Sequence, residues 1–252
     1  MSKKAEIRQS DIYSQILSNG EVKVVDLAKL YHVSMETIRT DLSTMENQGL
    51  IKKIHGGATL KESYSEVSVE YKMTENASDK QLIAKKALEY IQDGSTIFLD
   101  PGSTTLALAK YLPLKKDLLV ITNSLKIAQL VAETNHDLIF LGGKMLKKAK
   151  ATTGSFTNNH LDSLHIDTCF MGCDGFMNMD GPTTFAFEEM EVKQHALRNS
   201  TKKYLLADTS KFHKTGTYKF ANFSDFDCIF TTFLNNYERR MVEDVQKIVM
   251  AL

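Results

Sequence analysis

Cysteine and long apolar segments are both scarce in this sequence of 252 residues. The three cysteines, Cys169, Cys173 and Cys228, are odd in number and form no Cys-x-x-Cys pair, so the sequence indicates neither a disulfide framework nor a zinc site. The longest apolar runs, such as 118–121 and 138–141, are far too short to cross a bilayer, and the first residues lack the apolar core of a secretory signal. We therefore expect a cytoplasmic protein with reduced thiols, no metal, no cofactor and no membrane partner.

An excess of charge of either sign is also absent. Lysine plus arginine number 31, and so do aspartate plus glutamate. Residues 1–58 hold eight basic and seven acidic side chains, a surplus of one positive charge. A strongly basic domain would indicate a nucleic-acid partner, but this balance neither favours nor excludes one. Any prediction of DNA binding must therefore depend on where individual side chains lie.

The pattern of the chain changes around residues 59–78. Before this segment lies a short helical region, and after it strands and helices alternate. The segment is rich in Glu, Ser, Lys and Thr and poor in apolar side chains, which is typical of a linker, with one strand predicted over Ser65–Tyr71. We therefore expect a first domain over 1–58, a linker over 59–78 and a larger domain over 79–252.

The first region has the pattern of a helix-turn-helix followed by a β-wing. Apolar side chains at helical spacing predict helices over 7–17 and 25–30, then a third that begins after the N-cap Ser34 and ends at Gly49. A strand over 50–54 and a Gly-Gly turn predict the wing. Buried side chains would lock the helices together, so that the third helix can enter the major groove of DNA.

The side chains expected to contact DNA lie on the third helix and the wing. Ile38, Leu42 and Met45 would face the core, which leaves the opposite face of the helix for the groove. Arg39 and Thr40 suit phosphate or base contacts, and the basic wing would meet phosphates or the minor groove. Two short amphipathic helices more often only pack against each other in a protein core than bind DNA. This pattern alone therefore leaves both the packing and the DNA-binding interpretation open. The predicted DNA-binding residues are Ser34, Glu36, Thr37, Arg39, Thr40, Lys52, Lys53 and His55.

The larger region has the alternating pattern of an α/β domain. Short apolar segments separated by helix-length segments predict a parallel sheet covered by helices on both faces. Strands are predicted over 96–99, 118–121, 138–141, 168–171, 204–207 and 228–231. Helices are predicted over 79–92, 103–112, 124–134, 156–164, 187–199 and 237–250.

Glycine and small hydroxyl residues follow four of these strands, at 100–105, 122–124, 141–144 and 171–175, and helices are expected to follow them. In an open parallel sheet, ligands bind at the carboxyl ends of strands, where helix N-termini offer N–H groups to an anion. One such loop is ordinary turn chemistry, but four in succession favour a common anion site. The predicted ligand-binding residues are Lys80, Asp100, Gly102, Ser103, Thr104, Thr105, Thr122, Asn123, Ser124, Gly143, Asp174, Glu189 and Lys211.

The run from Val22 to Ala58, VKVVDLAKLYHVSMETIRTDLSTMENQGLIKKIHGGA, resembles the helix-turn-helix of the DeoR family, the deoxyribose-operon repressor type. Thr37-Ile38-Arg39 and the terminal His-Gly-Gly-Ala are among the matching elements. Lys23 stands where the family often has a small hydroxyl residue, and Thr40 and Lys53 replace arginines. These departures would shift the operator sequence and leave the scaffold intact.

The second region resembles the sensor domain of the same family. The resemblance implies a fold similar to ribose-5-phosphate isomerases and glucosamine-6-phosphate deaminases, with a pocket for a phosphorylated sugar that releases a carbohydrate-operon repressor from DNA. A homo-oligomer, either dimer or tetramer, is also expected, because a helix-turn-helix gains affinity from paired half-sites. Pro101 and the aromatic 185–187 depart from the pattern and leave the sugar open. The matching residues are Asp79-Lys80, 93–100, 102–105, 122–124, Gly142-Gly143, Asp174-Gly175, Glu188-Glu189 and 210–212.

Two other functions stay open from the residues alone. Asp174 and Glu189 fit the acid–base pair of a sugar-phosphate isomerase or deaminase with an appended DNA-binding domain. The isomerases carry an acidic cluster and a glycine-rich lysine loop, whereas this sequence has Gly175-Phe176 and Gly-Pro-Thr-Thr at 181–184. We therefore expect binding without catalysis. The other alternative is a purely architectural module, against which the repeated strand-end loops count.

Overall fold

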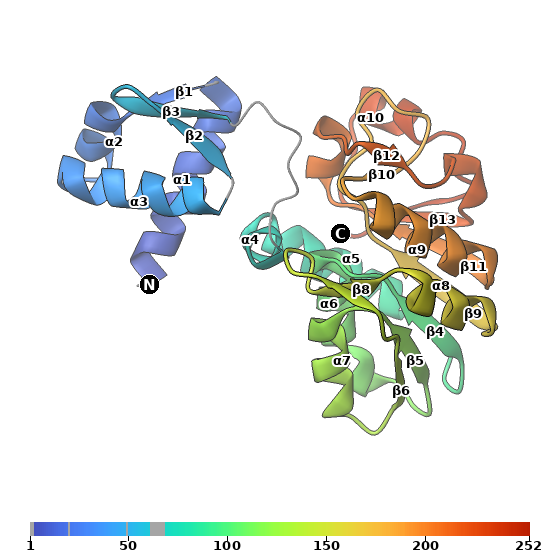
Figure 1. Ribbon diagram of the computed structural model, residues 1–252. Coiled ribbons are helices and arrows are strands. Elements are labelled where there is room, and N and C mark those ends of the chain that lie inside the picture. Colours follow the sequence, from blue (N-terminus) through green and yellow to red (C-terminus); the bar gives the residue numbers. More distant parts are fainter. Residues whose placement is uncertain (1–2, 20, 49, 61–68) are drawn as a thin grey trace. The chain divides into compact units, whose positions relative to one another are not determined.

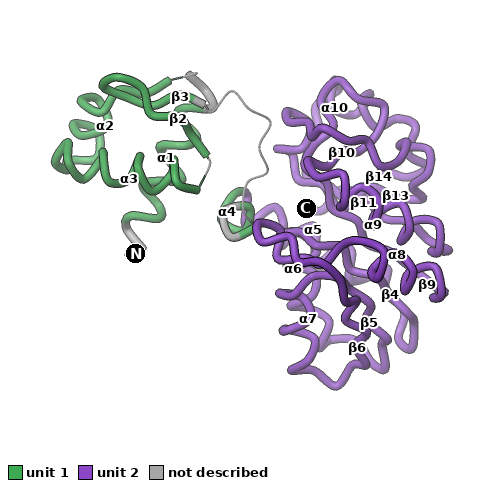
Figure 2. The backbone as a smooth tube through the Cα atoms, in the orientation of Figure 1, with its two compact units in different colours: residues 1–75 green, residues 76–252 purple. Residues whose placement is uncertain are grey.

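The computed structural model describes residues 3–19, 21–48, 50–60 and 69–252 of the chain (Figure 1). The chain forms two compact units, Met1–Glu75 and Asn76–Leu252, called unit 1 and unit 2 below (Figure 2). Among the described residues, no helix is long and apolar enough to cross a membrane.

Unit 1 has a helix-turn-helix and a small antiparallel sheet with strand order β1-β3-β2. Its elements are α1 (Lys3–Asn19), β1 (Glu21–Lys23), α2 (Val24–Leu30), α3 (Met35–Asn47), β2 (Ile51–Ile54), β3 (Gly57–Leu60) and α4 (Val69–Thr74). The buried face predicted for α3 is confirmed, since Ile38, Leu42 and Met45 are all buried in the core of unit 1.

Two predictions in unit 1 need correction or fall outside the described residues. The strand expected over Ser65–Tyr71 is wrong from Val69 onward, because these residues begin α4, and its earlier part lies outside the described residues. Gly49, expected to end α3, also lies outside them. The sequence did not predict β1, which has only three residues and gains its stability from pairing with β3.

The Gly-Gly turn of the wing is required by its geometry. Gly56 has φ +77°, a backbone conformation that side chains with a Cβ rarely adopt. At Gly57, a Cβ atom would lie 2.1 Å from the carbonyl oxygen of Val22 on β1. Glycine at both positions therefore lets β3 turn back from β2 and pack closely beside β1.

Unit 2 contains a seven-stranded sheet in the order β14-β13-β11-β9-β4-β5-β6, and every neighbouring pair is parallel. The predicted parallel sheet is thus confirmed. Its strands are β4 (Thr96–Leu99), β5 (Leu119–Thr122), β6 (Asp137–Phe140), β9 (Ile166–Met171), β11 (Ser200–Leu206), β13 (Cys228–Thr231) and β14 (Ile248–Met250).

Helices cover both faces of this sheet. The crossovers from β4 to β6 run toward one edge and those from β9 to β14 toward the other, so right-handed connections place their helices on opposite faces. Helix α6 packs against both α5 and α7, while α8 packs on α9 (Figure 1).

The order of the strands reverses between β4 and β9, which makes the ends of these strands the topological switch point. The helices are α5 (Ala77–Leu88), α6 (Ser103–Ala109), α7 (Leu125–Ala132), α8 (Ser155–Asp162), α9 (Phe187–Arg198) and α10 (Asn236–Met241), with 3-10 turns η1 (Leu112–Leu114), η2 (Thr209–His213) and η3 (Phe223–Asp225).

The helix predicted over 237–250 is wrong in its second half. Helix α10 ends at Met241, and residues 248–250 form β14, which pairs in parallel with β13. Val242 and Val245 are buried, so their helix-like spacing reflects packing of a turn against the core rather than a continuous helix.

Two small antiparallel strand pairs were not predicted. One is a hairpin in the segment between β6 and α8, and the other pairs a strand that follows β9 with a strand that follows β11. Their strands are β7 (Lys144–Leu146) with β8 (Ala151–Thr153), and β10 (Thr183–Thr184) with β12 (Tyr218–Lys219). The loops after β6 and β9 therefore lead into short strands, whereas helices follow those after β4 and β5 as expected.

Candidate DNA and ligand sites

The start of α3 is fixed by the capping interaction that the sequence predicted. The Oγ atom of Ser34 accepts a hydrogen bond from the backbone N–H of Thr37 at 3.1 Å. This bond satisfies one of the free N–H groups of the first turn. The two hydroxyl groups of Ser34 and Thr37 are also 2.9 Å apart, so both side chains have structural roles at the helix start.

The outward face of α3 presents polar side chains to solvent. Arg39 and Glu36 are 57% and 77% exposed, and their side chains form an ion pair of 3.2 Å. An exposed pair of this kind contributes about 0.2–1 kcal/mol, so it positions the guanidinium without holding it away from a phosphate or base. The hydroxyl of Thr40 donates to the carbonyl of Glu36 at 3.0 Å, one turn earlier.

The wing is attached to the second half of α3. The ammonium group of Lys53 donates to the hydroxyl of Ser43 at 2.9 Å, and the backbone N–H of Lys53 donates to Glu46 at 2.9 Å. Lys52 and His55 are exposed. Of the predicted wing residues, Lys53 thus has a structural role, while Lys52 and His55 face solvent.

A buried carboxylate joins α1 to α3, and the sequence did not single it out. Asp41 is 4% exposed; its Oδ2 accepts from Arg8 at 2.6 Å, and its Oδ1 accepts from Gln9 at 2.8 Å. Removing either donor would leave a buried charge poorly compensated. The signal was present in the sequence: Asp41 lies three residues after Ile38, on the apolar face of the helix.

The loops predicted to bind a ligand gather at one edge of the large sheet. Because β11, β9, β4 and β5 are adjacent and parallel, the loops after these strands all leave at the same edge. They carry Lys211, Asp174, the 100–105 segment and the 122–124 segment, respectively. We call this edge, with Lys80 of α5 and Glu189 of α9, the strand-end site.

Near the switch point, Lys193 of α9 connects the loops that follow β4 and β9. Its ammonium group donates to Asp100 Oδ2 and, at 3.1 Å, to the carbonyl of Gly172. Asp100 Oδ2 also accepts from the N–H of Gly172 at 2.9 Å. Burial works to lower the pKa of Lys193, but the carboxylates of Asp100 and Glu189 outweigh it and hold that pKa above its ordinary value. Lys193 was not predicted, and its partner Asp100 is one of the residues predicted to contact the ligand.

A hydroxyl group joins the other two predicted carboxylates. The Oγ1 atom of Thr184 lies 2.5 Å from Glu189 Oε2 and 3.2 Å from Asp174 Oδ2. Asp174 also accepts from the backbone N–H of Phe185 at 3.1 Å. These bonds place two carboxylates beside the loop that follows β9.

Lys80 and Lys211 are both buried and lie beside a carboxylate that the sequence did not single out. The Nζ atom of Lys80 is 3.9 Å from Asp208 Oδ2. Burial alone would raise the pKa of Asp208, but Lys211 and Lys80 outweigh it and lower the pKa to about 2. Asp208 is 0% exposed and caps η2 by accepting from the N–H of Ser210 at 3.0 Å.

Several other predicted residues hold the loops in shape. Thr105 donates to the carbonyls of Asp100 and Gly102, and Thr122 donates to that of Leu99. Ser124 caps α7 by accepting from the N–H of Ile127 at 3.4 Å. At Gly143, which has φ +148°, a Cβ would lie 2.5 Å from the carbonyl oxygen of Thr153.

Asn123 is buried and only partly satisfied. Its amide nitrogen donates to the carbonyl of Thr152 at 2.8 Å, whereas its buried Oδ1 atom has no hydrogen-bond partner among the described residues. A buried polar atom of this kind costs free energy unless a water or a ligand supplies a donor. The remaining residues predicted to bind the ligand are Thr104, which is 5% exposed, and the half-buried Gly102 and Ser103.

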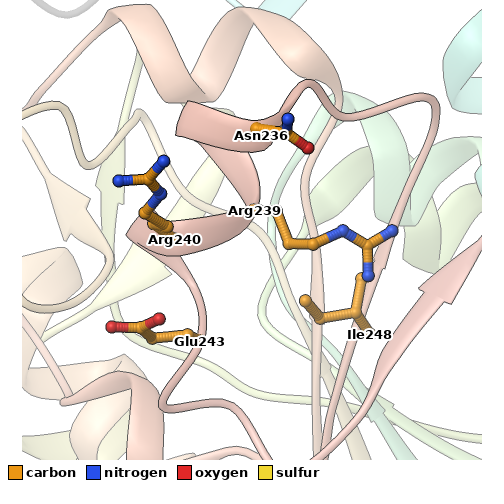
Figure 3. Close-up of a pocket in the computed structure, with 5 residues that line it drawn as sticks. All are labelled: Asn236, Arg239, Arg240, Glu243 and Ile248. Atoms are coloured by element: carbon orange, nitrogen blue, oxygen red, sulfur yellow. The ribbon is translucent and has the colours of Figure 1, made fainter.

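A separate pocket of about 450 Å³ lies beside α10 (Figure 3). Its lining consists of Asn236, Arg239, Arg240, Glu243 and Ile248. None of these residues belongs to the predicted ligand site. Ile248 is the first residue of β14, so it lies at the amino end of that strand, whereas the strand-end site lies at the carboxyl ends.

Comparison with family models matches both units. Residues 8–64 match the DeoR-like helix-turn-helix domain, and residues 75–232 match the DeoR C terminal sensor domain. The chain belongs to the DeoR family of transcriptional regulators. The family resemblance found in the sequence is therefore confirmed.

Relatives in this family cover nearly the whole chain. An uncharacterized HTH-type transcriptional regulator FruR of Bacillus subtilis is 33% identical over 95% of this chain and 98% of its own length. The lactose phosphotransferase system repressor of Staphylococcus epidermidis is 32% identical over 96% of this chain and 98% of its own length. These DeoR-family relatives are transcriptional regulators rather than enzymes.

Among solved structures, ribose 5-phosphate isomerase A of Methanocaldococcus jannaschii aligns with 54% of this chain and 54% of its own length, at 20% identity and a TM-score of 0.38. The α/β fold of unit 2 itself follows from its strand order and parallel pairing.

Proposed function

We propose that this DeoR-family regulator represses a carbohydrate-utilisation operon, and that a phosphorylated sugar bound to unit 2 controls its affinity for operator DNA. The observation that carries the proposal is the convergence of four loops at one sheet edge, beside the buried lysines Lys80 and Lys211. Cations, N–H groups and carboxylates in one place suit a ligand with both phosphate and hydroxyl groups. The lactose phosphotransferase system repressor among the relatives supports the carbohydrate class.

In this proposal the phosphate binds to the loop at 102–104, with Lys80 and Lys211 as its cations. The loop follows β4 at the switch point, where open parallel sheets bind ligands. Asp174, Glu189 and the Oδ1 atom of Asn123 accept hydrogen bonds from sugar hydroxyls, because carboxylates and amide oxygens are acceptors that would repel a phosphate.

For DNA, we propose that the outward face of α3 enters the major groove, with Arg39 as the principal contact. Arg39 and Thr40 are exposed on this face, and Lys52 and His55 of the wing are exposed to reach phosphates. A homodimer or homotetramer would present two such helices to paired half-sites.

A thermal-shift panel tests the ligand. Ribose 5-phosphate, glucose 6-phosphate, fructose 6-phosphate and fructose 1-phosphate are compared with the free sugars, since a ligand of the native state raises its stability by mass action. At least one phosphate is expected to raise Tm while its free sugar does not. Equal shifts from free sugars would contradict the phosphate site.

The DNA response is measured on a duplex that the protein selects from a random pool. The active phosphate is expected to weaken binding by roughly 5–150-fold, the ordinary range of allosteric coupling. Thr104→Glu places a negative charge in the phosphate position, so it should abolish the response and leave DNA binding intact. A variant that responds at the same sugar-phosphate concentration as the natural protein would show that the site is misplaced.

A further inference from the structure

Asp208 joins the lysines of the proposed phosphate site to the first residue of unit 2. Its Oδ1 atom accepts from the side-chain amide of Asn76 at 3.0 Å, across 132 residues of sequence. Its Oδ2 atom lies 3.9 Å from Lys80 Nζ and has no hydrogen bond among the described residues. One carboxylate thus contacts both the start of α5 and a cation of the ligand site.

Asn76 and Lys80 belong to the same turn of α5. The backbone N–H of Lys80 donates to the carbonyl of Asn76 at 3.1 Å, so the two residues move together. Asn76 is also the residue at which unit 2 begins, directly after Glu75 of unit 1. Any displacement of this turn is therefore passed to the peptide that leads into unit 1.

The side chain of Asn76 does not cap α5, so capping does not explain why an asparagine stands at this position. Asn76 is the N-cap residue of α5, but its side chain makes no capping hydrogen bond, and its φ of 50° is left-handed. Asparagine and glycine tolerate that conformation better than other residues. The side-chain amide of Asn76 is instead directed to Asp208.

We propose that Asn76 and Asp208 transmit ligand occupancy to the junction of the two units. A bound phosphate competes with Asp208 for Lys80 and Lys211, draws Lys80 away from the carboxylate and shifts the first turn of α5 with Asn76. The inference rests on the proposed function, because it takes the two lysines as the phosphate's cations.

Charge balance supports this competition. Two lysines and one carboxylate leave a surplus of one positive charge, whereas a phosphate monoester brings about −1.5 to −2. The bound state therefore has more negative charge than the lysines can neutralise, and the buried Asp208 is the group whose interactions must weaken. Burial makes this repulsion stronger than it would be in water.

Two variants of the full-length protein test the inference. Asn76→Gly keeps the left-handed backbone and removes only the amide that reaches Asp208, so DNA affinity without ligand should be unchanged. The sugar phosphate that gives the largest thermal shift among ribose 5-phosphate, glucose 6-phosphate, fructose 6-phosphate and fructose 1-phosphate is the probe. Its binding should change by less than about threefold, while its effect on DNA affinity should fall from the roughly 5–150-fold expected for the natural protein to below about twofold.

Asp208→Asn keeps the shape of the side chain and removes the competing charge. The same probe, and inorganic phosphate, should bind this variant several-fold more tightly, while the effect on DNA affinity falls. A purely structural role for Asp208 would instead weaken phosphate binding together with stability. Tighter binding with weaker coupling is the combination that supports the inference.

The outcomes separate this inference from the proposed function. If the natural protein binds DNA equally well with and without every sugar phosphate, the proposed function fails. If the natural protein responds and Asn76→Gly responds equally, only the transmission through Asn76 is wrong. If Asp208→Asn binds the probe no more tightly, the competition for Lys80 and Lys211 is wrong.

Discussion

The ammonium group of Lys193 binds the carboxylate of Asp100 inside unit 2, and this pair joins α9 to the loop after β4. Both side chains are almost fully buried, at 6% and 1% exposed. The carbonyl and N–H of Gly172 complete their hydrogen bonds, so the pair also fixes the loop after β9. The two loops that border the switch point are thus held by a single ion pair.

Lys193→Met should lower the free energy of unfolding by about 3–5 kcal/mol, because it leaves the Asp100 carboxylate buried without its cation. Urea denaturation followed by circular dichroism measures the loss. The double variant Lys193→Met with Asp100→Asn should recover part of it, since an amide oxygen still accepts from Gly172 N–H. A loss below about 1 kcal/mol in the single variant would mean that the pair contributes little.

Arg39→Ala should weaken binding to the selected duplex by about 1–3 kcal/mol if the guanidinium contacts a base edge. Glu36→Gln is the matched variant: it removes the carboxylate that pairs with Arg39 and also repels phosphates, so binding should tighten. Fluorescence anisotropy at several salt concentrations gives both affinities. Unchanged affinity in folded Arg39→Ala would exclude this residue as the principal contact.

Ser34→Ala should destabilise α3 by about 0.5–2 kcal/mol, because the N–H of Thr37 loses its acceptor. Ser34→Gly should cost only a few tenths of a kcal/mol, since glycine is tolerated at this position. Hydrogen exchange of the α3 amides measures the change in unit 1 separately from unit 2. Equal protection of the Thr37 amide in all three proteins would contradict the capping role.

Gly143→Ala should destabilise unit 2, whereas Gly142→Ala should not. The added methyl at Gly143 meets the Thr153 carbonyl at 2.5 Å in a positive-φ conformation, while nothing lies within 4 Å of the corresponding atom at Gly142. The expected loss at Gly143 exceeds about 1 kcal/mol. Thermal unfolding of the two neighbouring variants, side by side, checks this difference; similar Tm values would contradict it.

Asp208 should make stability depend on pH in the acid range. Its pKa in the folded protein is about 2, below the ordinary 3.8, so its contribution is fully present above about pH 4 and is lost as the pH falls toward 2. The difference corresponds to about 2 kcal/mol. The stability gap between the natural protein and Asp208→Asn should therefore be constant above pH 4 and shrink below it. A gap independent of pH down to 2 would contradict the lowered pKa.

The sequence predicted features that depend on neighbouring residues and missed those that depend on distant ones. The spacing of Ser34, Ile38 and Leu42 within a few residues predicts their helix. The loops rich in glycine and hydroxyl residues are recognised because they directly follow apolar strands. Lys193 gave no such signal, because its partner Asp100 lies 93 residues earlier in the chain. Asp208 likewise depends on Asn76, 132 residues away.

Short strands were missed for a related physical reason. The pairs β10–β12 and β7–β8 have two or three residues per strand, too few for an alternating pattern. The apolar segment of β14 follows Val242 and Val245 at a spacing that a continuous helix would also show. Only the parallel pairing with β13 distinguishes the two.

The position of β4 in the middle of the sheet has a consequence for synthesis of the chain. Its neighbour β5 follows within about twenty residues, but its other neighbour, β9, begins only at Ile166. Until the ribosome has released β9, β4 has one row of unpaired backbone groups, the kind of edge at which nascent chains associate. Unit 1 precedes all of these strands in the chain, so it is free to fold before the sheet of unit 2 has all of its strands.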